Sequence, residues 1–241
     1  VIRDAASYLL SCQKEDGGFG NEPDAATSSI VPTADAAMAL ALTGDISRAK
    51  EGGNTPLDYL VANPPAGNSS GGSLGRYVMG IVAAGGDPRD VSGVDYVEKL
   101  KDLAKPPYGD ENLFSESYIL LGLAAAGESE SSEAQAFISY VLDKQHSSGG
   151  WGWGGGSPDL DTTGIATIAL LAAGEAADSQ PIQDAIEHMS SQQNDDGGFP
   201  SSGMSADSNA ISDGWAMMAL NAAGVDPAEW RKGTATPATH L

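Results

Sequence analysis

Two carboxylates stand two positions apart in the segment PDLDTT (residues 158–163), shortly after the run GGW (residues 149–151). Neighbouring carboxyl groups such as Asp159 and Asp161 can titrate as a coupled pair and deliver a proton as a general acid. In a second interpretation, Thr162 caps a helix and Asp161 lies beside the positive end of that helix. A helix N-terminus favours the ionised carboxylate, which has no proton to donate. Both interpretations remain open.

A second candidate site comes from one variable position in five otherwise repetitive segments. Nine residues before a closing glycine, these segments carry Asp35, Arg76, Tyr118, Ile165 and Trp215, and four residues later each carries Ala or Gly. Variation above a ring of small residues is typical of a ligand-lined mouth, and partly solvated helix starts are the alternative. With two aspartates from the same helix starts added, the predicted ligand-binding residues are Asp35, Arg76, Tyr118, Asp161, Asp213 and Trp215.

Metal and disulfide chemistry have little support in this chain. The three histidines, His146, His188 and His240, fall on loops or expected outer helices, where they do not converge easily. Zinc needs three or four such ligands around one point, so we expect no metal site. The single cysteine, Cys12, excludes an internal disulfide and is expected to be a small buried hydrophobe.

The chain contains a five-fold internal repeat, and the candidate residues lie in the second half of each copy. Each copy ends in a small-residue stretch and a glycine: MALALTG (38–44), MGIVAAG (79–85), LGLAAAG (121–127), IALLAAG (168–174) and MALNAAG (218–224). A period of about 40–50 residues is typical of stacked helical hairpins. The closing glycine predicts a left-handed C-cap. A Ser or Thr twelve residues earlier predicts the helix start at Ser73, Ser115, Thr162 and Ser212, and Pro32-Thr33 takes that place in the first copy.

Three copies share a further pattern, in which a glutamine precedes two glycines and an aromatic residue. The glutamines are Gln13, Gln145 and Gln193, and the aromatic residues are Phe19, Trp151 and Phe199. We expect each glutamine to bond backbone groups of the neighbouring hairpin and to pack beside the aromatic ring. The pattern resembles the QW motif of the squalene–hopene cyclases, shared in looser form by protein prenyltransferase β subunits and the α domain of transcobalamin and intrinsic factor.

This resemblance implies an all-α fold, an α/α toroid of helical hairpins with an inner and an outer ring of helices. Five hairpins are present, and residues 236–241 match residues 55–60 in register, with His240-Leu241 opening a sixth. We therefore predict ten main helices in two layers and the start of an eleventh. Residues 1–241 are expected to form a single toroid domain, as a fragment of a longer chain.

The PDLDTT segment resembles the acid segment of class II terpene cyclases, and more closely the D-x-D-T-T variant of cyclases acting on prenyl diphosphates. That resemblance implies a role for Asp161 in protonating a substrate alkene, with Asp159 helping to hold the proton. Two features count against it. Class II cyclases build their site between two helical barrels, and they line it with rings that stabilise carbocations, whereas the expected inner helices hold only Tyr77, Tyr118 and Trp215.

The net charge of the chain limits the classes of partner that it can bind. Thirty-three acidic residues against twelve basic ones give a net charge of -21, which repels nucleic acid and anionic lipid. With no apolar run of the roughly 18 residues that a membrane span needs, we expect neither nucleic acid nor a membrane as a partner. The acidic surface favours an extracellular or cell-surface location.

From these observations we predict a non-enzymatic ligand-binding or interaction module with a transcobalamin-like toroid. Its ligand would lie at the mouth formed by the inner-helix N-termini. The partner would be a small molecule or another protein domain C-terminal to Leu241. No cofactor is required, and a corrinoid is the ligand that the transcobalamin resemblance suggests. The alternative is an enzyme of the terpene cyclase or prenyltransferase type that acts on a polyprenyl substrate with Asp161 as its acid. A purely structural spacer is a third interpretation.

Overall fold

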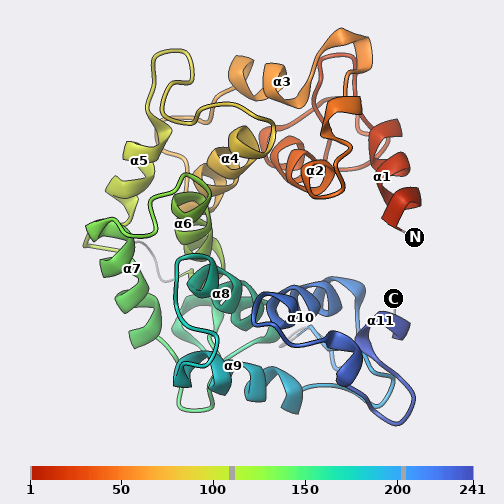
Figure 1. Cartoon of the computed structure of the whole chain (residues 1–241), viewed down its shortest axis with the longest axis vertical. Coiled ribbons are helices and arrows are strands. Elements are labelled where there is room, and N and C mark those ends of the chain that lie inside the picture. The colour runs from red at the N-terminus through yellow and green to blue at the C-terminus, as the bar shows by residue number, and fades with distance from the viewer. Residues whose placement is uncertain (1, 109–111, 202–204, 241) are drawn as a thin grey trace. The chain divides into compact units, whose positions relative to one another are not determined.

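The computed structural model describes residues 2–108, 112–201 and 205–240, and their regular structure is helical (Figure 1). The chain divides into two compact units, Val1–Leu103 with Gly122–Glu128, and Ala104–Leu121 with Ser129–Leu241. Helix α6 (Leu113–Ala125) contributes its first residues to the second unit and its last residues to the first. This division does not test the expected single toroid domain, which stays a prediction.

The first unit consists of helical hairpins in which the inner helices α2 (Ile30–Leu42) and α4 (Gly71–Ala83) pack side by side. The outer helices α1 (Ile2–Ser11), α3 (Pro56–Ala62) and α5 (Tyr96–Leu103) flank this pair (Figure 1). Two short 3-10 helices, η1 (Ile46–Arg48) and η2 (Glu51–Gly53), connect α2 to α3.

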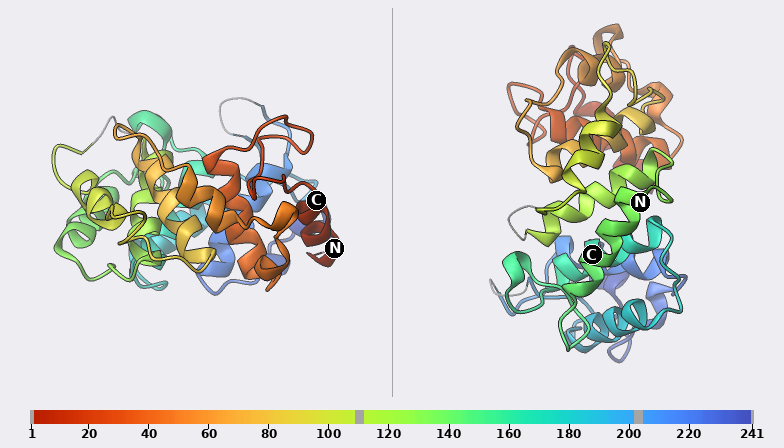
Figure 2. Two further views of the ribbon diagram at one scale, coloured as in Figure 1. Left: turned by 90° about the horizontal axis from the view of Figure 1, so that it is seen from above. Right: turned by 90° about the vertical axis from the view of Figure 1, so that its left-hand side faces the viewer.

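The second unit repeats this arrangement. Its inner helices α8 (Leu160–Ala172) and α10 (Ala210–Ala222) pack side by side. The outer helices are α7 (Ser132–Asp143), α9 (Gln180–Ser191) and the four-residue α11 (Pro237–His240). The short helices η3 (Trp153–Gly155) and η4 (Pro227–Glu229) lie in the connections. Figure 2 shows the helices of each unit from two further directions.

The described residues thus contain the ten predicted helices followed by a short eleventh, with inner and outer helices within each unit. Leu241, the second residue of the pair predicted to open the sixth hairpin, lies outside the described residues.

The inner helices begin three residues earlier than the sequence suggested. All five span 13 residues, and their N-caps stand fifteen residues before the closing glycine: Ser29, Ser70, Asn112, Asp159 and Asn209. Four of these caps accept a backbone hydrogen bond through the side chain, and Ser29 does not. The Ser and Thr residues predicted as caps instead occupy the third helical position, in the first turn. Four of them donate the N–H that the cap side chain accepts. The earlier start brings additional residues into the inner helices.

The predicted C-caps are present. All five closing glycines have φ between 75° and 105°, and a Cβ added at any of them would meet nothing within 4 Å. Backbone conformation rather than lack of space therefore requires glycine here.

Close approach between inner helices explains the small residues on their shared faces. A Cβ at Gly80 of α4 would lie 2.6 Å from the Cβ of Ala34 on α2. A Cβ at Gly164 of α8 would lie 3.1 Å from the Cβ of Trp215 on α10. Larger residues at these positions would separate the paired helices.

The three glutamines make the predicted contacts with neighbouring hairpins. The Gln145 side-chain amide donates to the carbonyls of Gly149 (2.7 Å) and Pro181 (2.8 Å). Gln13 donates to Gly17 and Asn54 and accepts from the Glu51 N–H, and Gln193 donates to Gly197 and Trp230. Each glutamine therefore ties its own loop to the hairpin that follows, which confirms the predicted bonds.

Candidate active site at the start of helices α8 and α10

Asp159 is the N-cap of α8. Its Oδ1 accepts from the Thr162 N–H at 2.8 Å, and its Oδ2 accepts from the Trp153 N–H at 3.1 Å. The alternative in which Thr162 caps this helix is therefore wrong, because Thr162 donates to the cap instead. Since both Asp159 oxygens are engaged by backbone N–H groups, this carboxylate holds the glycine-rich loop against the helix start.

Asp161 follows in the first turn of α8, where its surroundings differ from those of Asp159. Its Oδ1 is buried and has no hydrogen-bond partner. Burial raises the pKa of Asp161 above the ordinary value, a hydrogen bond with Ser212 lowers it, and the neighbouring Asp159 carboxylate raises it again. The net shift is upward. Burial is the largest cause of this shift, so the site holds the Asp161 proton more tightly than water does.

An aromatic cluster combines Trp215 of α10 with two rings of α6, Phe114 and Tyr118. Gly164, three residues after Asp161 on α8, lies against Trp215, three residues after Ser212 on α10. The Trp215 ring contacts Phe114 edge-on, with centroids 5.4 Å apart. The Phe114 ring in turn lies 6.1 Å from the ring of Tyr118. Ring faces of this kind can stabilise a cation, so the second unit carries an acid on α8 and aromatic side chains on α6 and α10.

Phe114 was missed by the sequence analysis, because the helix that carries it was expected to begin at Ser115. The N-cap is Asn112, whose Oδ1 accepts from the Ser115 N–H at 3.1 Å. The spacing of Asn112 from its closing glycine equals that of the other four caps, and this register was the available signal.

Asp213 has a structural role. Its side chain is completely buried, and Oδ1 accepts from the Phe199 N–H at 2.7 Å. Its Oδ2 lies 2.5 Å from His240 Nδ1. Thr33 and Thr163, at the same position of their repeats, accept the N–H of Phe19 and Trp151. Asp213 therefore anchors the aromatic loop and α11 through both its oxygens, and its expected ligand-binding role stays a prediction.

Asp35 and Arg76 belong to the first unit, whereas Tyr118, Asp161, Asp213 and Trp215 belong to the second. The convergence of all six on one mouth therefore stays a prediction. Asp35 Oδ1 lies 3.9 Å from Arg76 Nε, with the Asp35 side chain 48% exposed. Burial raises the pKa of Asp35, and the Arg76 charge opposes that rise. A loose ion pair of this exposure contributes little stability.

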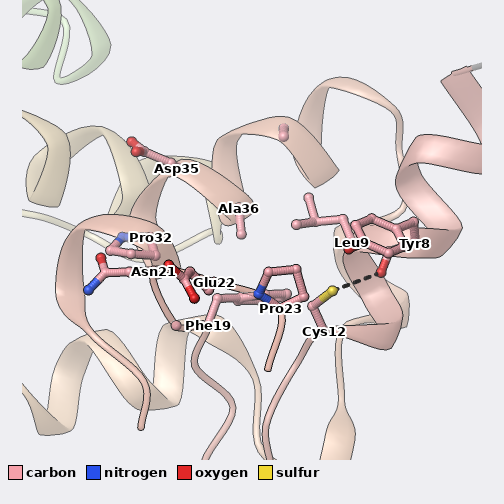
Figure 3. A pocket seen from close by; sticks show the side chains of 12 residues that line it. Tyr8, Leu9, Cys12, Phe19, Asn21, Glu22, Pro23, Pro32, Asp35 and Ala36 are labelled. Atoms are coloured by element: carbon pink, nitrogen blue, oxygen red, sulfur yellow. Dashed lines mark hydrogen bonds between the residues drawn. The ribbon is translucent and has the colours of Figure 1, made fainter. Parts of the chain in front are cut away.

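Asp35 also lines an open pocket of about 330 Å³ within the first unit (Figure 3). The pocket lies between α1, α2 and the loop after Phe19, and most of its lining is apolar, including Leu9, Pro23 and Ala36. Cys12 borders it and donates through Sγ to the Tyr8 carbonyl at 3.3 Å. Cys12 is half-buried rather than fully buried as expected.

Two of the three histidines pack against glycines of the aromatic loops. His188 and His240 each lie against the second glycine of the preceding aromatic loop, Gly150 and Gly198, where an added Cβ would collide with the ring. Among the residues that the structure describes, no three His, Cys, Asp or Glu side chains form a group that could hold a metal ion. None of the described helices combines the length and apolar character needed to cross a membrane.

Two family models match separate parts of the chain. The squalene-hopene cyclase C-terminal domain matches residues 119–236, and the prenyltransferase alpha-alpha toroid domain matches residues 2–59. The predicted resemblance and fold class are both confirmed. The chain has the all-α, α/α-toroid fold of the terpene cyclase and prenyltransferase superfamily.

One curated relative is similar to most of this chain. The chain is 26% identical to the drimenyl diphosphate synthase of Streptomyces showdoensis over 205 residues, which are 83% of this chain and 32% of that protein. It thus spans about a third of the length of this relative.

Among solved structures, the apo type II terpene cyclase MstE from Scytonema matches with a TM-score of 0.68 and 19% identity, over 97% of this chain and 75% of that one. A variant of MstE in complex with its substrate, geranylgeranyl dihydroxybenzoate, matches with a TM-score of 0.67 and 19% identity, over 97% of this chain and 74% of that one. At this identity the structures support the fold alone.

These findings overturn the predicted function. A non-enzymatic, transcobalamin-like binding module was expected, but the curated relative is a drimenyl diphosphate synthase and the structures described above are of a type II terpene cyclase. The enzyme alternative is the better supported one. The expectation of a small-molecule ligand agrees with MstE, whose complex contains a small-molecule substrate.

Proposed function

We propose that this chain carries the acid of a terpene cyclase that begins cyclisation by protonating an alkene of a polyprenyl substrate. The observation that carries the proposal is the Asp161 carboxyl, whose Oδ1 is buried without a partner and whose pKa is raised by burial. An alkene is a weak base, so its protonation needs a neutral carboxylic acid in a site that excludes water. The same features make this carboxyl a candidate functional group on physical grounds.

In the proposed step, the Asp161 O–H bond breaks and its proton forms a new C–H bond with one carbon of the terminal alkene. The alkene electrons supply that bond, which leaves a tertiary carbocation on the other carbon. Internal alkenes then attack in sequence to close rings, and loss of a proton from the final cation regenerates an alkene. The Asp161 carboxylate takes up a proton before the next cycle, so the reaction needs no redox partner.

The aromatic cluster suits the carbocation that follows protonation. Trp215 lies on α10 against Gly164, which follows Asp161 by three residues on α8, and its ring contacts Phe114 of α6. A cation near the faces of these rings would be stabilised by roughly 0.5–2 kcal/mol per ring. The rings therefore suit a hydrocarbon cation.

The substrate class that we propose is a prenyl diphosphate. The PDLDTT segment resembles the D-x-D-T-T variant of cyclases that act on such compounds, and the relative from Streptomyces is named for a diphosphate product. Geranylgeranyl dihydroxybenzoate, the substrate in the MstE complex, is the second candidate because it carries the same kind of alkene chain.

The test is product formation. Purified protein is incubated with farnesyl diphosphate, geranylgeranyl diphosphate or geranylgeranyl dihydroxybenzoate, and products are identified by mass spectrometry. We expect a cyclic product that retains the diphosphate, and we expect Asp161→Asn to abolish it. Asp184→Asn, on outer helix α9, is the control and should retain activity. Turnover that survives in Asp161→Asn, or no turnover of any of the three compounds, would contradict the proposal.

A further inference from the structure

The open pocket between α1, α2 and the loop after Phe19, called the α1–α2 pocket from here on, takes no part in the proposed function. Its volume of about 330 Å³ is at the lower end of the range for small-molecule sites. Such sites combine a mostly apolar lining with a few placed polar groups, and this pocket has both. Its chemistry therefore indicates what kind of ligand it could hold.

The repeat shows what kind of group the apolar lining is built to contact. Three of the lining residues have counterparts at the same repeat positions in the second unit: Leu9 and Met189, Phe19 and Phe199, and Ala36 and Ala216. Those counterparts form a buried hydrophobic cluster with Leu160 of α8, and Ile168 of the same helix packs against it. Met189 is fully buried there, whereas Leu9 is only partly buried. The lining of the α1–α2 pocket therefore suits aliphatic groups such as the side chains of Leu160 and Ile168.

The two ends of the α1–α2 pocket differ in polarity. Tyr8 and Leu9 of α1 lie at one end, and Asp35 of α2 and Glu22 of the loop lie at the other (Figure 3). Asp35 Oδ1 is 3.9 Å from Arg76 Nε, a separation longer than a hydrogen bond. Burial raises the pKa of Asp35 even though the Arg76 charge opposes the rise, so a further cation nearby would stabilise this carboxylate.

We propose that the α1–α2 pocket binds a cationic amphiphile, a molecule with an ammonium head group and a hydrocarbon tail. The tail would pack on Leu9 and Ala36, and the ammonium group would lie beside Asp35 and Glu22. The net charge of -21 adds a long-range attraction for cations and repels anions. A prenyl diphosphate has a suitable tail but an unsuitable head group, so this site goes beyond the proposed cyclase function and does not depend on it.

Cys12 makes occupancy of the pocket measurable, because it lines the pocket and is the single cysteine of the chain. Its thiol is half-buried, so iodoacetamide should alkylate it in the folded protein, and a bound ligand should slow that reaction. Isothermal titration calorimetry measures the same binding without relying on the thiol.

Three probes share one eight-carbon tail and differ only in the charge of the head group: n-octylammonium, n-octanol and octanoate, each below the concentration at which it aggregates. We expect octylammonium to protect Cys12 at the lowest concentration and octanol at a roughly three- to tenfold higher one, because octanol lacks the ion pair. Octanoate and farnesyl diphosphate should not protect it. Equal protection by the three eight-carbon probes, or tighter binding of octanoate, would overturn the inference.

Variants test whether the carboxylate end selects the head group. Asp35→Asn should weaken the binding of octylammonium by roughly three- to tenfold and leave the binding of octanol unchanged. Asp24→Asn is the matched control, because it removes an equal charge from an exposed residue beside the lining residue Pro23, and it should change neither affinity. Ala39→Lys, at an exposed lining position, adds a like charge and should weaken octylammonium more than octanol.

An unchanged affinity for octylammonium in both Asp35→Asn and Ala39→Lys would overturn the inference. A Cys12 thiol that is alkylated only after unfolding in urea would also overturn it, because another segment or a second copy of the chain would then cover the pocket. Both results stand whether or not the protein cyclises a polyprenyl substrate, so a failure here is distinct from a failure of the proposed function.

Discussion

Relative to the wild type, Asp161→Asn should become more favourable for the unfolding free energy as the pH rises. Loss of an aspartate at a helix start normally has the opposite effect. The ordinary pKa of the group is 3.8, and burial raises it in the folded state. The folded chain therefore binds this proton more tightly than the unfolded chain does. Between the two pKa values, wild-type stability falls with rising pH, because folding then opposes ionisation. Asparagine does not titrate and avoids this loss.

The magnitude follows from the size of the shift. Each unit by which the folded pKa exceeds the ordinary value corresponds to about 1.4 kcal/mol of unfolding free energy. The free energy gained by Asp161→Asn should start to grow near pH 3.8 and level off above the raised folded pKa. Effects of the asparagine side chain that do not depend on pH drop out, because the prediction concerns only how the difference in unfolding free energy between variant and wild type changes with pH.

The assay is urea unfolding of wild type and variant between about pH 3 and pH 7. Asp58 provides a control of opposite sign, since it also lies in the first turn of a helix, α3, but hydrogen bonds from Thr55 lower its pKa. Asp58→Asn should become more destabilising as the pH rises toward 3.8 and then stay constant. If the difference for Asp161→Asn were flat, or changed in the same direction as that for Asp58→Asn, the reasoning that burial outweighs the helix terminus would be refuted.

Three further predictions concern the scaffold. Gln145→Ala should cost about 1–3 kcal/mol in denaturant unfolding, because two carbonyls lose their donor; a change within error would contradict this. His240 has a raised pKa through its bond with Asp213, so its stabilisation should be complete below the ordinary 6.5 and be lost as the pH rises through the raised folded value. Histidine NMR would show this, and a titration at or below 6.5 would refute it. Gly164→Val should push α10 away from α8 at Trp215, costing about 1–3 kcal/mol by thermal unfolding, and unchanged stability would argue against that close contact.

The architecture was predictable because the repeat encodes it locally. The closing glycines adopt the left-handed conformation that their position implied, and the three glutamines make the expected bonds between hairpins. Helix starts were placed three residues late, because Ser and Thr at the third helical position resemble caps. The actual caps include Asn112, Asp159 and Asn209, and their common register was not used.

The site was harder to predict, since its chemistry depends on contacts between helices. Asp161 and Asp213 both looked like aspartates in the first turn of an inner helix. Only the fold shows that both Asp213 oxygens form hydrogen bonds, with Phe199 and His240, whereas Asp161 Oδ1 has no partner. Burial, which the sequence did not give, reverses the expected effect of the helix terminus on Asp161.

The wrong function followed from counting features of the whole chain. The low number of rings on the expected inner helices argued against cyclisation, but the earlier helix start adds Phe114, which contacts Trp215. Net charge describes the protein surface and gives no information on a buried carboxyl such as that of Asp161.

The central claim, that Asp161 transfers a proton to an alkene, is tested most directly by running the cyclisation in deuterium oxide. Asp161 exchanges its proton with solvent before each cycle, so the product should carry one deuterium bound to carbon at the end of the chain that began as the terminal alkene. Mass spectrometry and NMR would detect it, and Asp161→Asn should give no such product. A cyclic product without this deuterium, or one formed with release of the diphosphate, would contradict the account.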